Sequence, residues 1–93
     1  MKLAWTPKSL RKFKRLIRKN PQLKLPIENT LRRLTQDPFH FSLKTHKLQG
    51  NLADCWSCSI DYQYRIIFEF VGKPDDANDT ILLLNIGTHD EVY

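Results

Sequence analysis

The hydrophobic residues change their spacing once along the chain, from a helical pattern to a strand pattern. Leu10, Phe13 and Ile17 follow one another at helical spacing, and a second apolar stripe runs from Leu23 to Leu34. In the second half, apolar residues alternate with polar ones or form β-branched and aromatic runs, which are typical of strands. This order predicts an α+β fold in which a helical hairpin packs on a small, mainly antiparallel, twisted sheet.

Prolines and capping residues predict where the two helices begin and end. Thr6-Pro7 supplies a hydroxyl N-cap and a proline at the first helical position, where its missing N–H costs nothing. Asn20-Pro21 ends the first helix, and Gln36-Asp37-Pro38 ends the second. Pro26 interrupts the second stripe, so the second helix either kinks at this residue or begins there.

The expected strands give the element order β-α-α-β-β-β. A short strand at residues 2–5 precedes the helices, and strands at residues 55–60, 64–71 and 81–86 follow them. The last strand is nearly all apolar and therefore suits the centre of the sheet. The other segments are predicted to be a loop across the sheet at 39–50, a hairpin turn at 61–63, a turn-rich loop at 72–79 and a polar tail at 87–93.

Length and composition exclude several classes of protein. With 93 residues, the chain is expected to form a single domain over residues 1–93. No run of about 18 apolar residues is present, and no apolar stretch follows the basic N-terminus as in a signal peptide. Two cysteines cannot form a disulfide scaffold. We therefore expect a cytoplasmic protein without a membrane partner.

The formal net charge of +5 is divided unevenly along the chain. Residues 1–50 carry 13 basic and two acidic side chains, a charge of +11, whereas residues 51–93 carry two basic and eight acidic side chains, a charge of −6. Such asymmetry indicates a polyanionic partner, either nucleic acid or an acidic protein. The alternative is a solvated helix surface whose charge is offset by the other half of the chain.

Cys55 and Cys58 form a C-x-x-C sequence, but they fall within an alternating strand. The alternation places Cys58 on one face and Ser57 and Ser59 on the other, so the two cysteines should point to opposite faces. A thioredoxin-like pair would instead open a helix, and no second C-x-x-C supplies further zinc ligands. We interpret the pair as structural and expect no metal site.

Three histidines titrate near neutral pH when unperturbed. His40 stands between two phenylalanines, which favours a partly buried loop position. His46 and His89 lie outside the regular apolar patterns, and each could be a surface residue or part of a site. Their irregular spacing is weak evidence for a metal site.

Arg65 lies within a hydrophobic strand and is the only basic residue between Lys47 and Lys73. Charged side chains are seldom buried without a partner. Arg65 therefore either pairs with Asp61 or Glu69, or lines a cleft and binds an anion through its guanidinium.

Three motifs, taken in order, resemble those of the RelE/ParE superfamily of small bacterial toxins. The motifs are H-K-L-Q-G at 46–50, Y-R-I-I-F at 64–68 and G-T-H-D-E-V-Y at 87–93. Together with the element order, they are most similar to the YafQ-like (RelE/StbE) branch of ribosome-dependent mRNA interferases. The resemblance spans nearly the whole chain. It implies the toxin of a type II toxin–antitoxin system, an endoribonuclease that cleaves mRNA in the ribosomal A site.

The resemblance also implies the residues of a metal-independent and cofactor-free site. The catalytic positions of the family match His46, Arg65, His89 and Tyr93. The two histidines would transfer protons during attack by the ribose 2′-OH, in either assignment of base and acid. Arg65 would stabilise the phosphorane charge, and Tyr93 would stack on or orient a base.

Two positions depart from the YafQ-like pattern. Ser59 stands where that branch has a second histidine, and Gln63 stands where it has an aspartate. The catalytic set is therefore expected to be thinner than in that branch, or partly RelE-like.

The resemblance implies a cognate antitoxin as partner, together with mRNA and ribosomal RNA. Operator DNA would be contacted only through the antitoxin. The cations expected to bind the RNA backbone are Lys44, Lys47, Arg11, Lys12 and Arg15.

Two other functions remain open, a ParE-like inhibitor of DNA gyrase on the same fold, or a non-catalytic basic binding domain. The two histidines argue against the gyrase inhibitor, which needs no proton-transfer pair.

Overall fold

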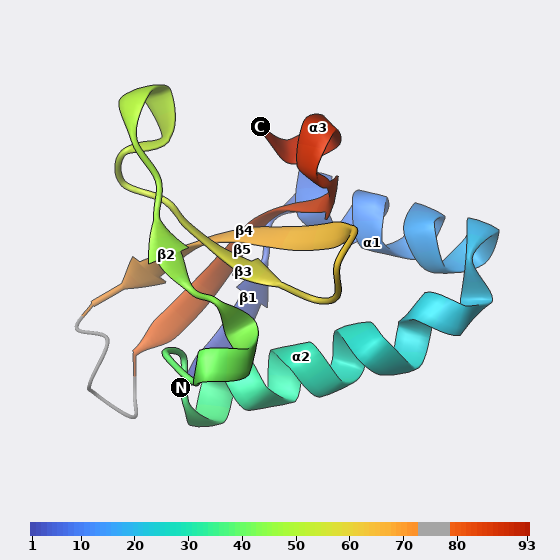
Figure 1. Cartoon of the computed structure of the whole chain (residues 1–93), viewed down its shortest axis with the longest axis horizontal. Coiled ribbons are helices and arrows are strands. Elements are labelled where there is room, and N and C mark those ends of the chain that lie inside the picture. Colours follow the sequence, from blue (N-terminus) through green and yellow to red (C-terminus); the bar gives the residue numbers. More distant parts are fainter. Residues whose placement is uncertain (73–78) are drawn as a thin grey trace.

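The last strand of the chain lies in the interior of a five-stranded sheet (Figure 1). The computed structural model describes residues 1–72 and 79–93. The strand order is β1-β5-β4-β3-β2, with β1 parallel to β5 and all other neighbours antiparallel. The strands are β1 (Lys2–Trp5), β2 (His46–Lys47), β3 (Trp56–Ser59), β4 (Tyr64–Val71) and β5 (Thr80–Thr88). The α+β fold with a mainly antiparallel sheet is confirmed.

Helix α1 (Pro7–Lys19) begins at the predicted cap. The Thr6 hydroxyl accepts from the Ser9 N–H at 3.0 Å, and the Ser9 hydroxyl accepts from the Thr6 N–H at 3.0 Å. Ser9 is fully buried and donates to the carbonyl of Leu83 in β5 at 2.7 Å. The cap of α1 is thereby tied to the sheet.

Helix α2 (Lys24–Gln36) follows a single 3₁₀ turn at Pro21–Leu23. Pro26 lies in the first turn of α2, where a backbone N–H has no helical partner. The second of the two alternatives for Pro26 is therefore correct, because the helix begins two residues before this proline. It ends at Gln36, as predicted.

The apolar stripe of α2 packs on one face of the sheet. Ile27 and Leu34 of α2 are fully buried. They belong to one core cluster with Cys58, Ile66 and Ile86, which stand side by side in β3, β4 and β5. In Figure 1, α2 runs along this side of the sheet and the short helix α3 (His89–Val92) lies on the opposite side.

Two elements are missed by the sequence prediction. The segment 39–50, predicted as a loop, contains β2, the 3₁₀ turn Phe41–Leu43 and the first residue of a second 3₁₀ turn, Gly50–Leu52. Strand β2 has two residues, too few to produce a recognisable alternation. The predicted polar tail at 87–93 contains the end of β5 and the one-turn helix α3. This prediction is wrong because Val92 is 7% exposed and anchors the tail.

Most other boundaries agree with the sequence. Strand β4 has the predicted limits, and Asp61 forms the predicted hairpin turn by accepting from the N–H groups of Gln63 and Tyr64. The loop predicted at 72–79 lies largely outside the described residues. Within the described part of the chain, no helix has the length and apolar character needed to cross a membrane.

Candidate active site

The face of the sheet opposite α2 carries the predicted site residues. His46 of β2 stands opposite Ser57 of β3, while Arg65 of β4 stands opposite Ser59 of β3 and Gly87 of β5. Residues directly opposite each other share a face, and so do Ser57 and Ser59, two positions apart in one strand. The register therefore places His46 and Arg65 on one face, two strands apart and offset by two residues, which is about 12 Å between their backbones.

Arg65 is held by main-chain carbonyls. Its Nη1 donates to the carbonyl oxygens of Asp61 at 2.7 Å, Tyr64 at 3.0 Å and Tyr62 at 3.2 Å. Among the described residues, no ion pair joins Arg65 to Asp61 or Glu69. Carbonyl oxygens fix the guanidinium without neutralising it, so its full charge remains available to an anion. Of the two sequence interpretations, this arrangement favours the arginine that lines a cleft.

Helix α3 presents His89 above this face. The N–H and the hydroxyl of Thr88 donate to Oε1 of Glu91 at 3.0 and 2.9 Å, which closes a capping box. These hydrogen bonds hold the pKa of Glu91 below its ordinary value. His89 is exposed, and its Nδ1 lies 3.5 Å from Oδ1 of Asp90.

Tyr93 lies between His89 and the sheet. Its ring meets the His89 imidazole edge to face, with 4.5 Å between the ring centroids. Its hydroxyl donates to the Oγ of Ser57, which is fully buried. Tyr93 is 44% exposed, so part of the ring remains open to a ligand. The hydroxyl contact connects α3 to the strand residue that stands opposite His46.

His46 is oriented by the carbonyl of Lys44, which lies 3.0 Å from its Nδ1. A carbonyl can only accept, so Nδ1 carries the proton of the neutral ring and the lone pair of Nε2 is free. Lys44 has a φ of 51°, in the left-handed region that residues with side chains rarely adopt. This conformation ends the 3₁₀ turn at Phe41–Leu43 just before β2.

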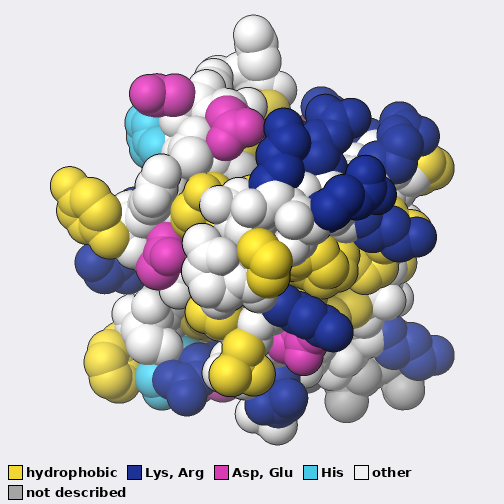
Figure 2. All heavy atoms as spheres, turned by 90° about the vertical axis from the view of Figure 1, so that its right-hand side faces the viewer, with side chains coloured by type: hydrophobic (Ala, Val, Ile, Leu, Met, Phe, Trp, Pro, Cys, Tyr) yellow, Lys and Arg dark blue, Asp and Glu magenta, His cyan; other side chains and the backbone are white. Residues whose placement is uncertain are grey.

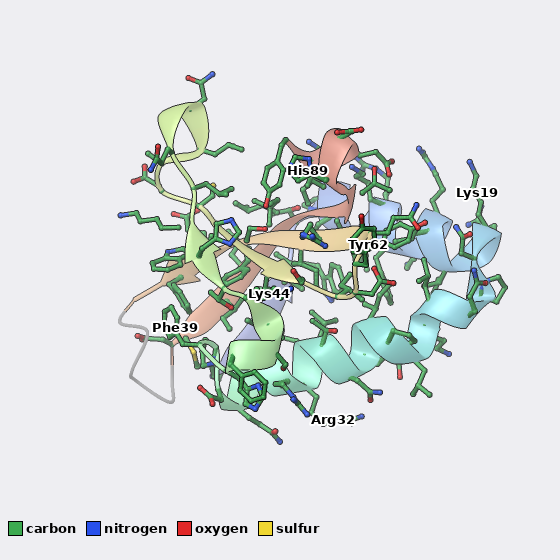
Figure 3. All side chains as sticks on the ribbon, in the orientation of Figure 1. Lys19, Arg32, Phe39, Lys44, Tyr62 and His89 are labelled. Carbon is green, nitrogen blue, oxygen red and sulfur yellow. The ribbon has the colours of Figure 1, made fainter. Side chains whose placement is uncertain are left out.

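Two hollows flank Arg65. One, of about 520 Å³, is lined by Tyr62, Gln63, Arg65, Thr88, His89 and Asp90. The other, of about 280 Å³, is lined by Ser42, Lys44, Ser59, Ile60, Asp61, Tyr62 and Arg65. Figure 3 labels Lys44, Tyr62 and His89, which lie around these hollows. Arg65 and His89 are thus brought together in one hollow, whereas His46 lines neither and is linked to them through Ser57 and Tyr93.

The expected RNA-binding cations differ in their exposure. Arg11, Arg15, Lys44 and Lys47 are exposed. Lys12 is half-buried, donates to Oδ1 of Asn85 at 2.6 Å, and has a pKa lowered by its burial. In Figure 2, Lys and Arg side chains gather over the side of the molecule that carries the helices. Lys12 is therefore partly a structural residue, while the other four are free to bind a polyanion.

The remaining histidine has a local structural role, as predicted. His40 is half-buried and caps the 3₁₀ turn at Phe41–Leu43, its Nδ1 accepting from the N–H of Ser42 at 3.2 Å. Its ring stacks on Phe41, with 4.6 Å between the centroids.

The cysteines also behave as predicted structural residues. Cys58 is fully buried, Cys55 is half-buried, and both are free thiols. Burial raises the pKa of Cys58 to about 12, which makes its thiol unreactive. Among the described residues, no three His, Cys, Asp or Glu side chains converge as metal ligands.

Three residues of the site are absent from the sequence prediction. Ser57 is buried beneath Tyr93, Tyr62 lines both hollows, and Glu91 caps α3. The sequence does contain a signal for Glu91, because Thr88-x-x-Glu91 is a capping-box pattern. No sequence signal shows that the Tyr93 hydroxyl bonds to Ser57 and not to Ser59. That choice depends on where the segment after β5 folds back on the sheet.

Comparison with known proteins gives a family match over almost the whole chain. Residues 3–93 match the family described as the ParE toxin of the type II toxin–antitoxin system, parDE. A search of curated protein sequences finds no match.

Several solved structures have the same fold at low sequence identity. The YoeB/ParE toxin from Agrobacterium tumefaciens has a TM-score of 0.80 and 24% identity, over 96% of this chain and 99% of that chain. YafQ from E. coli has a TM-score of 0.78 and 13% identity, over 98% and 96%. A chain of the YoeB–YefM complex from Staphylococcus aureus has a TM-score of 0.73 and 18% identity, over 96% and 97%.

Proposed function

The chain belongs to the ParE toxin family of type II toxin–antitoxin systems, in the RelE/ParE superfamily, and we propose that it is a ribosome-dependent endoribonuclease. It would cleave mRNA in the cytoplasm and be neutralised by a cognate antitoxin. One observation carries the proposal: Arg65 and His89 share a hollow on the sheet face that α2 leaves free, with Tyr93 against His89 and His46 farther along the same face. A proton carrier beside an unneutralised guanidinium, with a second histidine on the same face, suits phosphodiester cleavage.

The hydrogen bonds support one assignment of base and acid. The lone pair on Nε2 of His46 takes the proton of a ribose 2′-OH, because Nδ1 is occupied by the Lys44 carbonyl. The 2′-oxygen then attacks the adjacent phosphorus, and the bond from phosphorus to the 5′-oxygen breaks. His89, whose imidazolium has Asp90 as a nearby counter-ion, protonates the departing 5′-oxygen. The products are a 2′,3′-cyclic phosphate and a 5′-hydroxyl.

Arg65 and Tyr93 act on the same phosphate and nucleotide in this proposal. The Arg65 guanidinium stabilises the negative charge that develops on the phosphorane. The exposed part of the Tyr93 ring orients a base, and its hydroxyl fixes α3, which carries His89. The exposed cations Arg11, Arg15 and Lys47 bind the RNA backbone.

The test is primer extension of cellular mRNAs after the toxin is induced. His46→Ala, His89→Ala and Arg65→Ala should each lower mRNA cleavage at least ~100-fold and abolish growth arrest, with the fold intact by circular dichroism. His40→Ala is the matched control and should remain toxic, because His40 only caps a 3₁₀ turn. Full toxicity of both His89→Ala and Arg65→Ala would disprove the assignment of the site.

Inhibition of DNA gyrase is the second candidate, because the matched family is named after ParE. The purified toxin should leave gyrase unaffected if the ribonuclease proposal is correct. Gyrase-dependent DNA breaks without mRNA cleavage would favour the gyrase inhibitor. A third outcome would indicate a non-catalytic binding domain. In that case the protein would cause neither mRNA cleavage nor DNA breaks, and His46→Ala and His89→Ala would have the same phenotype as wild type.

The antitoxin partner is proposed because a similar fold occurs in the YoeB–YefM complex from Staphylococcus aureus. A short open reading frame beside the gene is the expected source of the antitoxin. Co-expression of its product should restore growth and co-purify with the toxin.

A further inference from the structure

Tyr62 is the most exposed large hydrophobic side chain of the described residues, at 97% of its maximum. It lies in the turn between β3 and β4, and Figure 3 labels it together with His89. Within the described part of the chain, no other aromatic ring packs against it. Leaving a tyrosine ring in water forgoes the stabilisation that its burial would give. Packing within the chain therefore does not account for this side chain.

The backbone that carries Tyr62 is firmly held. The Asp61 carboxylate accepts from the N–H groups of Gln63 at 2.9 Å and Tyr64 at 2.8 Å. Arg65 donates to the carbonyl of Tyr62 itself at 3.2 Å and to that of Asp61 at 2.7 Å. The turn is therefore ordered before any ligand arrives, which reduces the entropy lost on binding.

Tyr62 also stands between the two hollows that flank Arg65. It lines the hollow of about 520 Å³ that contains His89 and the hollow of about 280 Å³ that contains Lys44. An exposed aromatic ring between cationic side chains is the arrangement that proteins use for single-stranded nucleic acids, where cations meet phosphates and rings stack on bases. The Arg65 guanidinium, which holds the turn that carries Tyr62, would also bind the phosphate of the RNA.

We propose that Tyr62 is a stacking platform for one unpaired base of the RNA, next to the phosphate bound by Arg65. This inference rests on the proposed ribonuclease function and adds a residue that positions the substrate. Stacking of this kind accepts any base, so Tyr62 contributes to RNA binding and placement more than to proton transfer. RNA is favoured over a protein partner because Arg65 and Lys44 line the adjoining hollows beside the ring and would bind successive phosphates, while Asp90 and Asp61 line the same hollows and accept hydrogen bonds.

The test uses ribosomes translating a defined mRNA, with an abasic nucleotide placed in turn at each position around the cleavage site. For wild-type toxin, one abasic position should raise the KM about tenfold, because one stacked base is lost. Tyr62→Ala should raise the KM by a similar factor on intact mRNA and show no further effect at that abasic position. Its kcat should stay within about threefold of wild type. Tyr62→Trp should retain wild-type behaviour on both mRNAs.

Phe41→Ala is the matched control, because Phe41 is 85% exposed but stacks on His40 and lines neither hollow. It should cleave both mRNAs as wild type does. If Tyr62→Ala responds to every abasic position as wild type does, the stacking proposal is overturned while the ribonuclease proposal stands. The stacking proposal is overturned in the same way if Tyr62→Ala only weakens antitoxin binding. If wild-type toxin leaves mRNA intact, the ribonuclease proposal fails, and the stacking proposal fails with it.

Discussion

The hydroxyl of Tyr93 donates to the Oγ of Ser57, so that the last residue of the chain is fastened to a buried position in β3. The contact spans 36 residues of sequence and closes α3 over the sheet. It also leaves the Tyr93 ring against His89, with 4.5 Å between the centroids. The placement of His89 therefore depends on the hydroxyl group of Tyr93.

Removal of this hydroxyl should loosen α3. Tyr93→Phe leaves the buried Ser57 hydroxyl without its partner, and we expect the free energy of unfolding to fall by about 1 kcal/mol. Urea denaturation measures this loss. Ser57→Ala should cost a similar amount, and the double variant should cost less than the sum of the two, because both report the same hydrogen bond. Strictly additive losses would show that the two residues are not coupled.

Glu91 should make the stability of the protein depend on acidity. Its pKa is lowered in the folded state by hydrogen bonds from Thr88, so the carboxylate stabilises the fold above the ordinary carboxyl range. This contribution is lost as the pH falls below about 5. Between about pH 6 and pH 3, the free energy of unfolding of Glu91→Gln should therefore fall less than that of wild type. Asp54→Asn, at an exposed side chain outside α3, is the control and should follow the wild-type profile.

The basic residues of α1 should separate into RNA-binding and structural groups. Arg11→Ala and Arg15→Ala remove exposed charges, so each should reduce the salt dependence of binding to a single-stranded RNA by about 0.7 in log–log slope. Lys12→Ala also removes the hydrogen bond to Asn85 and should lower the melting temperature more than either arginine variant. Fluorescence anisotropy between about 50 and 300 mM salt and thermal denaturation measure the two effects. Identical behaviour of all three variants in both experiments would contradict this division.

The two cysteines should differ in reactivity. Cys58 is fully buried and its pKa is raised to about 12, so iodoacetamide at about pH 8 should leave it unmodified in the native protein. Cys55 is half-buried, and desolvation together with nearby carboxylates raises its pKa, so it should react slowly. Mass spectrometry of the digested protein measures both rates. Rapid modification of Cys58 in the native protein would contradict its burial, and denatured protein supplies the positive control.

The parts of the fold that local chemistry determines could be predicted from the sequence. Thr6-Pro7 marks the start of α1, and the apolar run from residue 64 to residue 71 has the limits of β4. Strand β2 could not be predicted, because its two residues form a strand only through pairing with Ser57 and Trp56. Helix α3 escaped prediction for a similar reason, since a single turn is too short for periodicity and depends on the burial of Val92.

The candidate site also has a part that could be predicted from the sequence and a part that could not. Its members could be chosen from the family motifs, but their arrangement depends on strand register. Arg65 illustrates the difference, because the sequence offers Asp61 and Glu69 as partners by charge. The folded chain instead uses the carbonyl oxygen of Asp61, a group whose direction no side-chain pattern reveals.

The position of β5 has a consequence for how the protein is made. This strand is the last to be synthesised, yet it separates β1 from β4, and Lys2 pairs with Thr80 across 78 positions of sequence. Strand β1 therefore has no neighbour in the sheet until β5 has been synthesised. Contacts so distant in sequence form slowly, since the chain must first lose the entropy of closing a long loop. A nascent chain thus lacks both the completed sheet and the helix that carries His89. The face that carries Arg65 and His89 is therefore complete only after β5 and α3 have been synthesised.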